Sequence, residues 1–107
     1  MKALKYFTVK SKRNLVDITC LFSTFDATIE NETKSLFAFL FFQSKANIRL
    51  NLGNIKNISQ EDLFRIIEFG RELFIEKRHL VLLHPPVGIA RYVRRFGLDS
   101  VIRLAKD

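Results

Sequence analysis

The C-terminal half of the chain alternates between short strand-like segments and longer amphipathic ones. Residues 48–52 alternate apolar and polar side chains, and residues 80–83 are all apolar. Amphipathic runs follow each of them, over residues 59–77 and 87–96, and residues 101–104 end the pattern. Strand, helix, strand, helix, strand is the order typical of parallel βαβ units. We therefore expect an α/β fold with three consecutive strands that run in the same direction after residue 47.

The N-terminal half predicts a hairpin followed by one helix. Residues 5–9 and 15–22 are rich in β-branched and aromatic side chains, and the polar residues 10–14 between them predict a turn. Residues 23–31 have mixed character and are expected to form a connection. Residues 33–43 are densely apolar and contain neither Gly nor Pro, which favours a helix.

The composition favours one soluble domain spanning residues 1–107. Hydrophobic residues make up 48% and charged residues 27% of the chain, as in ordinary globular proteins. The single cysteine, Cys20, lies in an apolar run and is expected to be a buried small hydrophobe. No disulfide framework or signal peptide is evident, so we expect a cytoplasmic protein. The longest apolar run, residues 36–42, is too short to span a membrane.

That apolar run contains more phenylalanine than one helix face can hold. Phe37, Leu40 and Phe41 can share a face, which leaves Phe39 and Phe42 pointing elsewhere. Two interpretations remain open. Either a neighbouring element covers the outlying rings, or they form a patch for a partner, such as a homodimer through residues 37–42.

The long amphipathic segment, residues 59–77, has clear start signals. Ser59 is a suitable N-cap, and Gln60, Glu61 and Asp62 fill the first turn, where the helix dipole favours carboxylates. One apolar face follows at helical spacing, and a glycine on it suggests close approach to the sheet. The residues of this face are Leu63, Ile66, Ile67, Gly70 and Phe74.

A net charge of +7 makes acidic surfaces, nucleic acid and anionic lipid conceivable partners. Arg91, Arg94 and Arg95 stand on the polar side of the 87–96 segment, opposite Ile89, Val93 and Phe96. They either form a solvated face or contact an acidic partner. The chain has no nucleic-acid motif and no aromatic residues interleaved with this basic face, so we expect no direct binding to nucleic acid.

Catalytic patterns are absent from the sequence. His79 and His84 flank the 80–83 strand at a spacing that puts them on opposite faces, so we expect no shared metal ion. The four glycines are scattered singly, and neither a Gly-rich phosphate cradle nor a nucleophile elbow occurs. We therefore expect neither enzymatic activity nor a cofactor, and a nucleotide-binding function lacks its motif.

The order of elements and several short motifs resemble the STAS domain of bacterial anti-sigma factor antagonists. The resemblance covers residues 4–104. It rests on Phe25-Asp26 after the second strand, on Leu50-Asn51-Leu52-Gly53-Asn54-Ile55, and on a closing rhythm. That rhythm is an apolar strand, proline, a helix, Gly97-Leu98 and a last short strand. The resemblance implies a single STAS-like domain with a mixed β-sheet of four or five strands and helices packed mainly on one side.

The resemblance also implies a function in partner switching without enzymatic activity. In that family the unphosphorylated antagonist binds an anti-sigma factor that is also a serine kinase, and so releases the sigma factor. Phosphorylation of a serine at the start of the helix after the third strand ends that binding. A phosphate there adds about −1.5 to −2 charges and repels an acidic or apolar partner surface.

This chain departs from the family at the phosphorylated position. The family usually has Asp-Ser-Ser/Thr-Gly-Leu-Gly there, and alignment on residues 50–52 and Leu63 places Glu61 over the serine. Ser59 then takes the place of the preceding acid, and Asp62 and Phe64 stand where the family has glycine. Three interpretations follow: Glu61 mimics the phosphorylated state, Ser59 is a substitute acceptor, or phosphoregulation has been lost.

The expected partner-binding residues surround this helix start. An ordinary structural role remains open for two of them, since Ser59 can be only an N-cap and Asp26 only a loop or helix-capping carboxylate. The residues expected to bind a partner are Asp26, Asn54, Asn57, Ile58, Ser59, Gln60, Glu61 and Asp62.

An alternative function is a STAS-like subunit of a lipid-transport or transporter complex, which docks on an ATPase without phosphoregulation.

Overall fold

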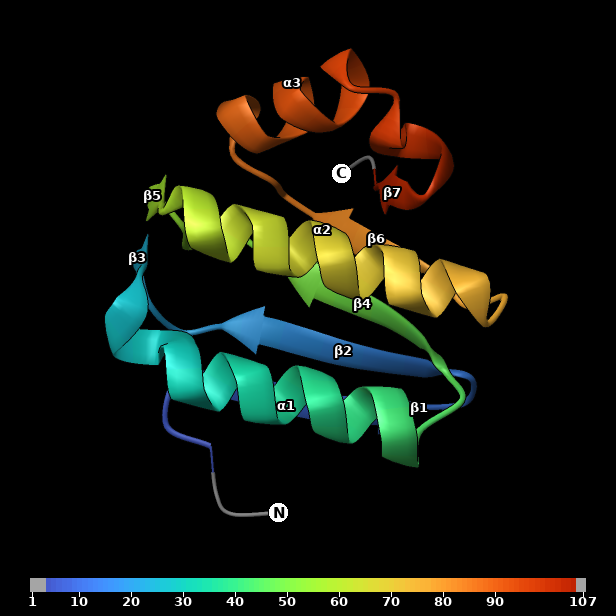
Figure 1. Cartoon of the computed structure of the whole chain (residues 1–107). Coiled ribbons are helices and arrows are strands. Elements are labelled where there is room, and N and C mark those ends of the chain that lie inside the picture. Colours follow the sequence, from blue (N-terminus) through green and yellow to red (C-terminus); the bar gives the residue numbers. More distant parts are fainter. Residues whose placement is uncertain (1–3, 106–107) are drawn as a thin grey trace.

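A five-stranded mixed sheet runs through the molecule in the computed structural model, which describes residues 4–105 (Figure 1). β1 is antiparallel to β2, and the other neighbouring pairs are parallel. The three strands after residue 46 therefore run in one direction, as the sequence predicts. In spatial order the strands are β1 (Phe7–Lys12), β2 (Leu15–Cys20), β4 (Asn47–Asn51), β6 (Leu80–Leu83) and β7 (Ile102–Leu104).

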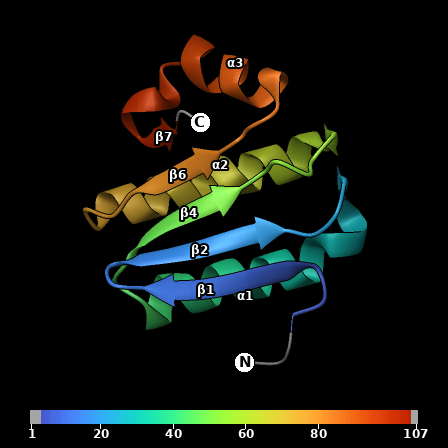
Figure 2. The same cartoon turned by 180° about the vertical axis from the view of Figure 1, so that it is seen from behind.

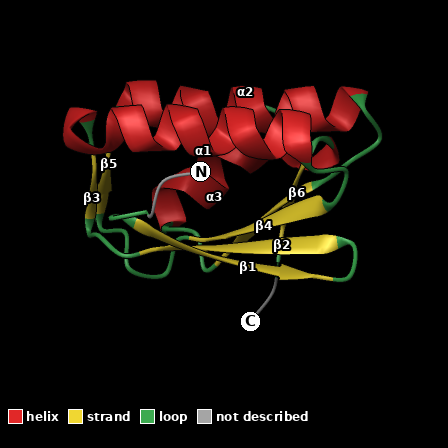
Figure 3. Ribbon diagram, turned by 90° about the horizontal axis from the view of Figure 1, so that it is seen from below, coloured by secondary structure: helices red, strands yellow, loops and turns green. Residues whose placement is uncertain are grey.

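Two long helices cover one face of this sheet. α1 (Glu30–Gln43) and α2 (Gln60–Ile75) lie side by side above the strands, as the edge-on view in Figure 3 shows. α3 (Val87–Arg95) lies beside the edge formed by β6 and β7. Figure 2 shows the opposite face of the sheet without a helix over it. The predicted mixed sheet with helices mainly on one side is therefore confirmed.

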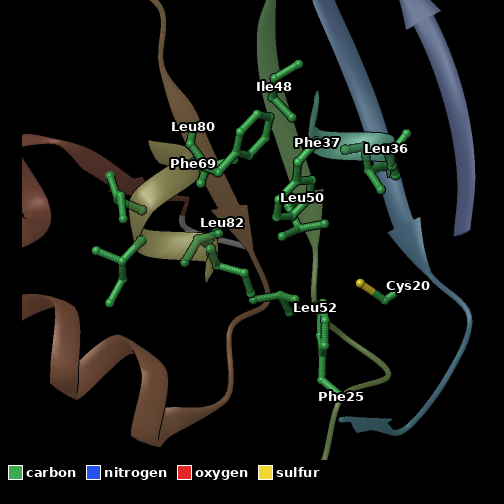
Figure 4. Packing of buried hydrophobic residues seen from close by; sticks show 14 of the residues in the cluster. Cys20, Phe25, Leu36, Phe37, Ile48, Leu50, Leu52, Phe69, Leu80 and Leu82 are labelled. Atoms are coloured by element: carbon green, nitrogen blue, oxygen red, sulfur yellow. The ribbon is translucent and has the colours of Figure 1, made fainter. Parts of the chain in front are cut away.

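The main core lies between these two layers. The strands alternate, so that Ile48 and Leu50 of β4 point into the core with no exposed surface. Above them, Phe37 of α1 stacks on Phe69 of α2, with ring centroids 4.2 Å apart and planes within 7° (Figure 4). The apolar run of α1 is thus partly core.

A buried arginine joins the end of α1 to the turn after α2. Arg78 is 4% exposed, and its guanidinium donates to the main-chain oxygens of Leu40 at 3.1 Å, Phe41 at 3.2 Å and Ala46 at 2.9 Å. The last carbonyl groups of a helix lack partners within the helix, so Arg78 supplies donors where they are needed. Its charge also meets Glu76 at 3.1 Å.

The predicted turn at residues 10–14 is wrong in extent. Residues 10–12 belong to β1, with Lys10 opposite Asp17, and only Arg13 and Asn14 form the turn, Asn14 with a φ of 60°. β1 is an edge strand, so its polar side chains face solvent and look like a loop in the sequence. The strand begins at Phe7 rather than residue 5.

Three short features of the connections were not predicted. β3 (Thr24–Phe25) and β5 (Asn57–Ile58) form a separate two-stranded parallel ribbon. A 3-10 turn, η1 (Ala27–Ile29), leads directly into α1, which therefore begins three residues before the predicted start; a second, η2 (Leu98–Ser100), precedes β7.

The helix faces differ from prediction at two aromatic positions. Ile66, Ile67 and Gly70 are buried as expected, but Phe74 is 43% exposed. Likewise Phe96, predicted on the apolar side of α3, is 60% exposed, because it follows the last residue of that helix.

Candidate functional site

The β3–β5 ribbon brings the expected site residues to one end of the molecule. Its register pairs Phe25 with Ile58, and the Ser59 amide donates to the Phe25 carbonyl at 2.9 Å. Asp26 and Ser59 follow those paired residues, so the ribbon places them next to each other. This end lies beyond the carboxyl ends of β2 and β4 (Figure 1), where open α/β sheets commonly bind ligands.

Ser59 caps α2 through a closed set of hydrogen bonds. Its hydroxyl accepts from the Asp62 amide at 3.1 Å and donates to the Asp62 carboxylate. That carboxylate also accepts from Arg65 at 2.8 Å, and Arg65 reaches Glu30 of α1 at 3.2 Å. The predicted N-cap is therefore confirmed, and its network also ties α2 to α1.

Asp62 differs from the other residues expected to bind a partner. It is only 2% exposed, because its carboxylate is engaged by Ser59 and Arg65 inside the cap. Its position suits it to hold the first turn of α2 rigid. Gln60 and Glu61, in contrast, are exposed on the outer side of that turn.

Glu61 is a carboxylate without an ion-pair partner among residues 4–105. It lies in the first turn of a 16-residue helix, where the dipole favours a negative charge. Ser59 and Asp62 fix the turn, so the Glu61 side chain is presented from a rigid base.

A depression of about 630 Å³ adjoins this helix start at the end of β2. Asp26 and Asn54 both line it: Asp26 caps η1 by accepting from the Thr28 amide at 3.0 Å, and the Asn54 amide donates to the Cys20 carbonyl at 3.0 Å. Leu21 also lines it and is 52% exposed.

Leu21 was missed by sequence reasoning. It directly follows the last residue of β2, so its position at a strand's carboxyl end was the available signal. The remaining expected residues lie in β5, where Asn57 is exposed and Ile58 is half-buried.

The thiol nearest this region is inert. Cys20 has no exposed surface, and burial raises its pKa to about 12, so the nucleophilic thiolate is scarcely populated at neutral pH. The expectation of a buried cysteine is confirmed. Within residues 4–105, His, Cys, Asp and Glu nowhere gather in threes that could hold a metal ion.

The side chains at this end of the molecule are suited to contact with another molecule. They include two carboxylates, Asp26 and Glu61, the amide side chain of Asn54 and the apolar Leu21, all held by a rigid scaffold. These groups can form ion pairs and hydrogen bonds around an apolar contact, which is the usual composition of a protein interface. None of the helices in the described part of the chain is long and apolar enough to cross a membrane.

Comparison with solved structures gives the fold a clear parallel. SpoIIAA of Bacillus, described as a cell fate determinant and an anti-sigma factor antagonist, matches in its phosphorylated form with a TM-score of 0.76 and 19% identity. The match covers 94% of this chain and 92% of SpoIIAA. TM1081 of Thermotoga maritima, considered an anti-sigma factor antagonist, matches with a TM-score of 0.78 and 16% identity, over 94% and 86% of the two chains.

Comparison at the level of sequence adds nothing to this likeness. No protein-family profile and no curated protein matches this chain. The structural likeness alone is enough to confirm the predicted STAS fold, since these neighbours are STAS domain proteins of nearly the same length.

Proposed function

We propose that this protein is a non-enzymatic interaction module of the anti-sigma factor antagonist type. It binds an anti-sigma factor that is a serine kinase, or a similar cytoplasmic regulator, through the start of α2 and the depression beside it. The proposal rests on Glu61, which is exposed on the rigid first turn of α2, and on Asp26, which lies beside the capping Ser59 and also lines the depression.

Glu61 supplies a permanent charge in place of a regulated one. It aligns with the family's phosphorylated serine, and it carries one negative charge at neutral pH where a phosphoserine would carry nearly two. A module with this residue has a fixed affinity for its partner, set by the charge at position 61.

Ser59 is poorly suited to replace the missing acceptor. Its hydroxyl donates to the buried carboxylate of Asp62, so a phosphate on Ser59 would meet a like charge at hydrogen-bonding distance. This repulsion favours Glu61 as a fixed charge over Ser59 as an acceptor.

A binding measurement tests the surface. The native partner is captured from cells with tagged full-length protein, and its affinity is then measured by calorimetry for wild type, Glu61→Ala and Leu21→Ala. Asp99→Asn serves as the control, because Asp99 is an exposed acid in η2, outside the proposed surface. We expect altered affinity in the first two variants and wild-type affinity in the control. Unchanged affinity for all three variants would remove the site assignment.

A phosphorylation assay tests whether Ser59 is a substitute acceptor. The protein is incubated with the captured kinase and ATP and examined by mass spectrometry. We expect no phosphate on Ser59. One added phosphate at that residue would show that regulation persists there, and Glu61 would then not be the fixed substitute.

The exposed phenylalanines of α1 support a second surface. Phe42 is 72% and Phe39 42% exposed, and Phe42 borders a groove of about 220 Å³ between α1 and α2. Such a patch suits either a homodimer or docking on the ATPase of a transporter complex. Sedimentation of wild type and Phe42→Ser distinguishes them. A dimer lost in the variant indicates the former, whereas a monomer that captures a transport ATPase indicates the latter and would replace the antagonist function.

A further inference from the structure

A second depression, here called the arginine groove, lies between α3 and the carboxyl ends of β6 and β7. It contains none of the residues proposed to bind a partner at the start of α2. Its volume is about 800 Å³, within the range of small-molecule sites. β7 ends beneath α3 in Figures 1 and 2. The lining combines apolar residues with three arginines and a histidine: Pro85, Val87, Ala90, Leu104, Ala105, Arg91, Arg94, Arg95 and His84.

The three arginines of this groove have no counter-charge within the part of the chain that the structure describes. Arg91, Arg94 and Arg95 make no ion pair or hydrogen bond within residues 4–105, and α3 contains no acidic residue. Arg49, Arg65, Arg71 and Arg78 are paired with acids, whereas the exposed Arg13 has no acidic partner in that part of the chain. Arg49 binds Asp17, for example, and Arg65 binds Asp62.

Helical spacing groups these cations. Residues three and four apart on a helix have Cβ atoms about 5–6 Å apart, so the guanidinium groups of Arg94 and Arg95 can both approach that of Arg91. Like charges this close repel one another until an anion lies among them. An anion bound in the groove would relieve this repulsion, so the binding of a negative group is favoured.

The chemistry of the lining narrows the ligand. Guanidinium groups bind phosphate through paired hydrogen bonds, which makes arginine the usual side chain for phosphate recognition. The apolar wall of Val87, Ala90 and Leu104 suits a carbon skeleton rather than a bare ion. The position beyond the carboxyl ends of two parallel strands is also where open α/β sheets place their ligands.

We infer that this groove binds the phosphate group of an organic ligand. Arg91, Arg94 and Arg95 contact the phosphate oxygens, and the apolar wall contacts the attached skeleton. A soluble phosphorylated molecule and a phospholipid headgroup share this chemistry. Val87 and Phe96, which are 72% and 60% exposed at the two ends of α3, would lie against the lipid in the second case.

Two probes test the inference on the full-length protein. Inorganic pyrophosphate is titrated into isotopically labelled protein and followed by amide NMR shifts, with sodium chloride of equal ionic strength as the reference. Sedimentation with vesicles of phosphatidylcholine, with and without phosphatidylglycerol, gives the lipid arm. We expect saturable shifts around Arg91–Arg95, retention on anionic vesicles, or both.

A matched pair of variants shows whether the groove or the net charge is responsible. The double variant Arg91→Gln/Arg94→Gln is compared with Arg13→Gln/Lys45→Gln, which removes the same charge from exposed positions outside the groove. We expect at least about a tenfold loss of affinity in the first, equivalent to about 1.4 kcal/mol, and little change in the second. A circular dichroism melt confirms that each variant is folded.

The two probes distinguish a soluble phosphorylated ligand from a phospholipid headgroup. Binding of pyrophosphate alone identifies a soluble ligand, and binding of anionic vesicles alone identifies a headgroup. Failure of both probes, or an equal loss in the two double variants, would overturn the inference. None of these outcomes tests the partner-binding surface proposed at the start of α2, because none of the substituted residues belongs to that surface.

Discussion

Replacing Gly70 with alanine should destabilise the protein, although alanine is the better helix former. Gly70 lies in α2 where the helix meets β6 and β7. A Cβ atom at this position would come within 2.6 Å of Ile102 Cγ1, 3.0 Å of Ile102 Cδ1 and 3.3 Å of Leu80 Cδ2. The substitution therefore sets a gain in helix propensity against a steric clash.

The clash should exceed the gain. Alanine is favoured over glycine within a helix by about 1 kcal/mol. Non-bonded carbons prefer about 3.5–4.0 Å, so the new methyl is too close to Ile102 by about 1 Å. Ile102 and Leu80 have no exposed surface and cannot turn away into solvent. Overpacking costs about 1–3 kcal/mol. A contact at 2.6 Å to a fully buried side chain belongs to the upper part of that range, about 2–3 kcal/mol, so after the gain in helix propensity we expect a net loss of about 1–2 kcal/mol.

Urea denaturation followed by circular dichroism measures this loss, and Gly88→Ala is the matched control. Gly88 lies in α3, and a Cβ there would have no atom within 4 Å, so that variant should gain about 0.4–1 kcal/mol. In an Ile102→Ala background, Gly70→Ala should cost little. If Gly70→Ala proved as stable as wild type while Gly88→Ala behaved as expected, the contact between α2 and β7 would not be rigid.

Three other substitutions or probes follow from individual contacts. Arg78→Ala leaves the Leu40 carbonyl and its neighbours without a hydrogen-bond donor, so the free energy of unfolding measured in urea titrations should fall by at least about 2 kcal/mol. An unchanged midpoint would contradict this. The Asp17 pKa is lowered by hydrogen bonding to Arg49, so the pair stabilises above the ordinary carboxylate pKa and is lost on acidification. Arg49→Gln should therefore cost up to about 1 kcal/mol at pH 7 and progressively less below about pH 4; a constant difference in unfolding free energy would refute the pairing. Cys20 should resist maleimide until urea unfolds the chain, and rapid labelling of native protein would show that it is accessible.

The features that were predictable from sequence are those that repeat along the chain. α2 shows apolar residues at helical spacing, a capping serine and first-turn acids, and each signal is local. β6 is a short apolar run bounded by polar residues and prolines. Such elements form their own backbone hydrogen bonds or bury one face at regular intervals, so the periodicity of apolar residues along the sequence reveals them.

The features that were missed depend on partners distant in sequence. β3 and β5 are two residues each and exist only because they pair across more than thirty intervening positions. Arg78 looks like a surface cation, yet it binds carbonyl groups that lie 32 to 38 residues away. The arginine groove likewise needs β7 beneath α3, which no local spacing reveals.

The outer edge of β1 has a consequence for how copies of this protein can associate. Within residues 4–105, β1 pairs only with β2, so one row of its backbone amide and carbonyl groups is open to water. Lys10 and Lys12 are exposed side chains of this strand, and Lys12 also pairs with Asp17 of β2 at 3.1 Å. Charged side chains on an edge strand, lysine above all, disfavour pairing with the edge of another copy. Strand-to-strand association through β1 is therefore disfavoured.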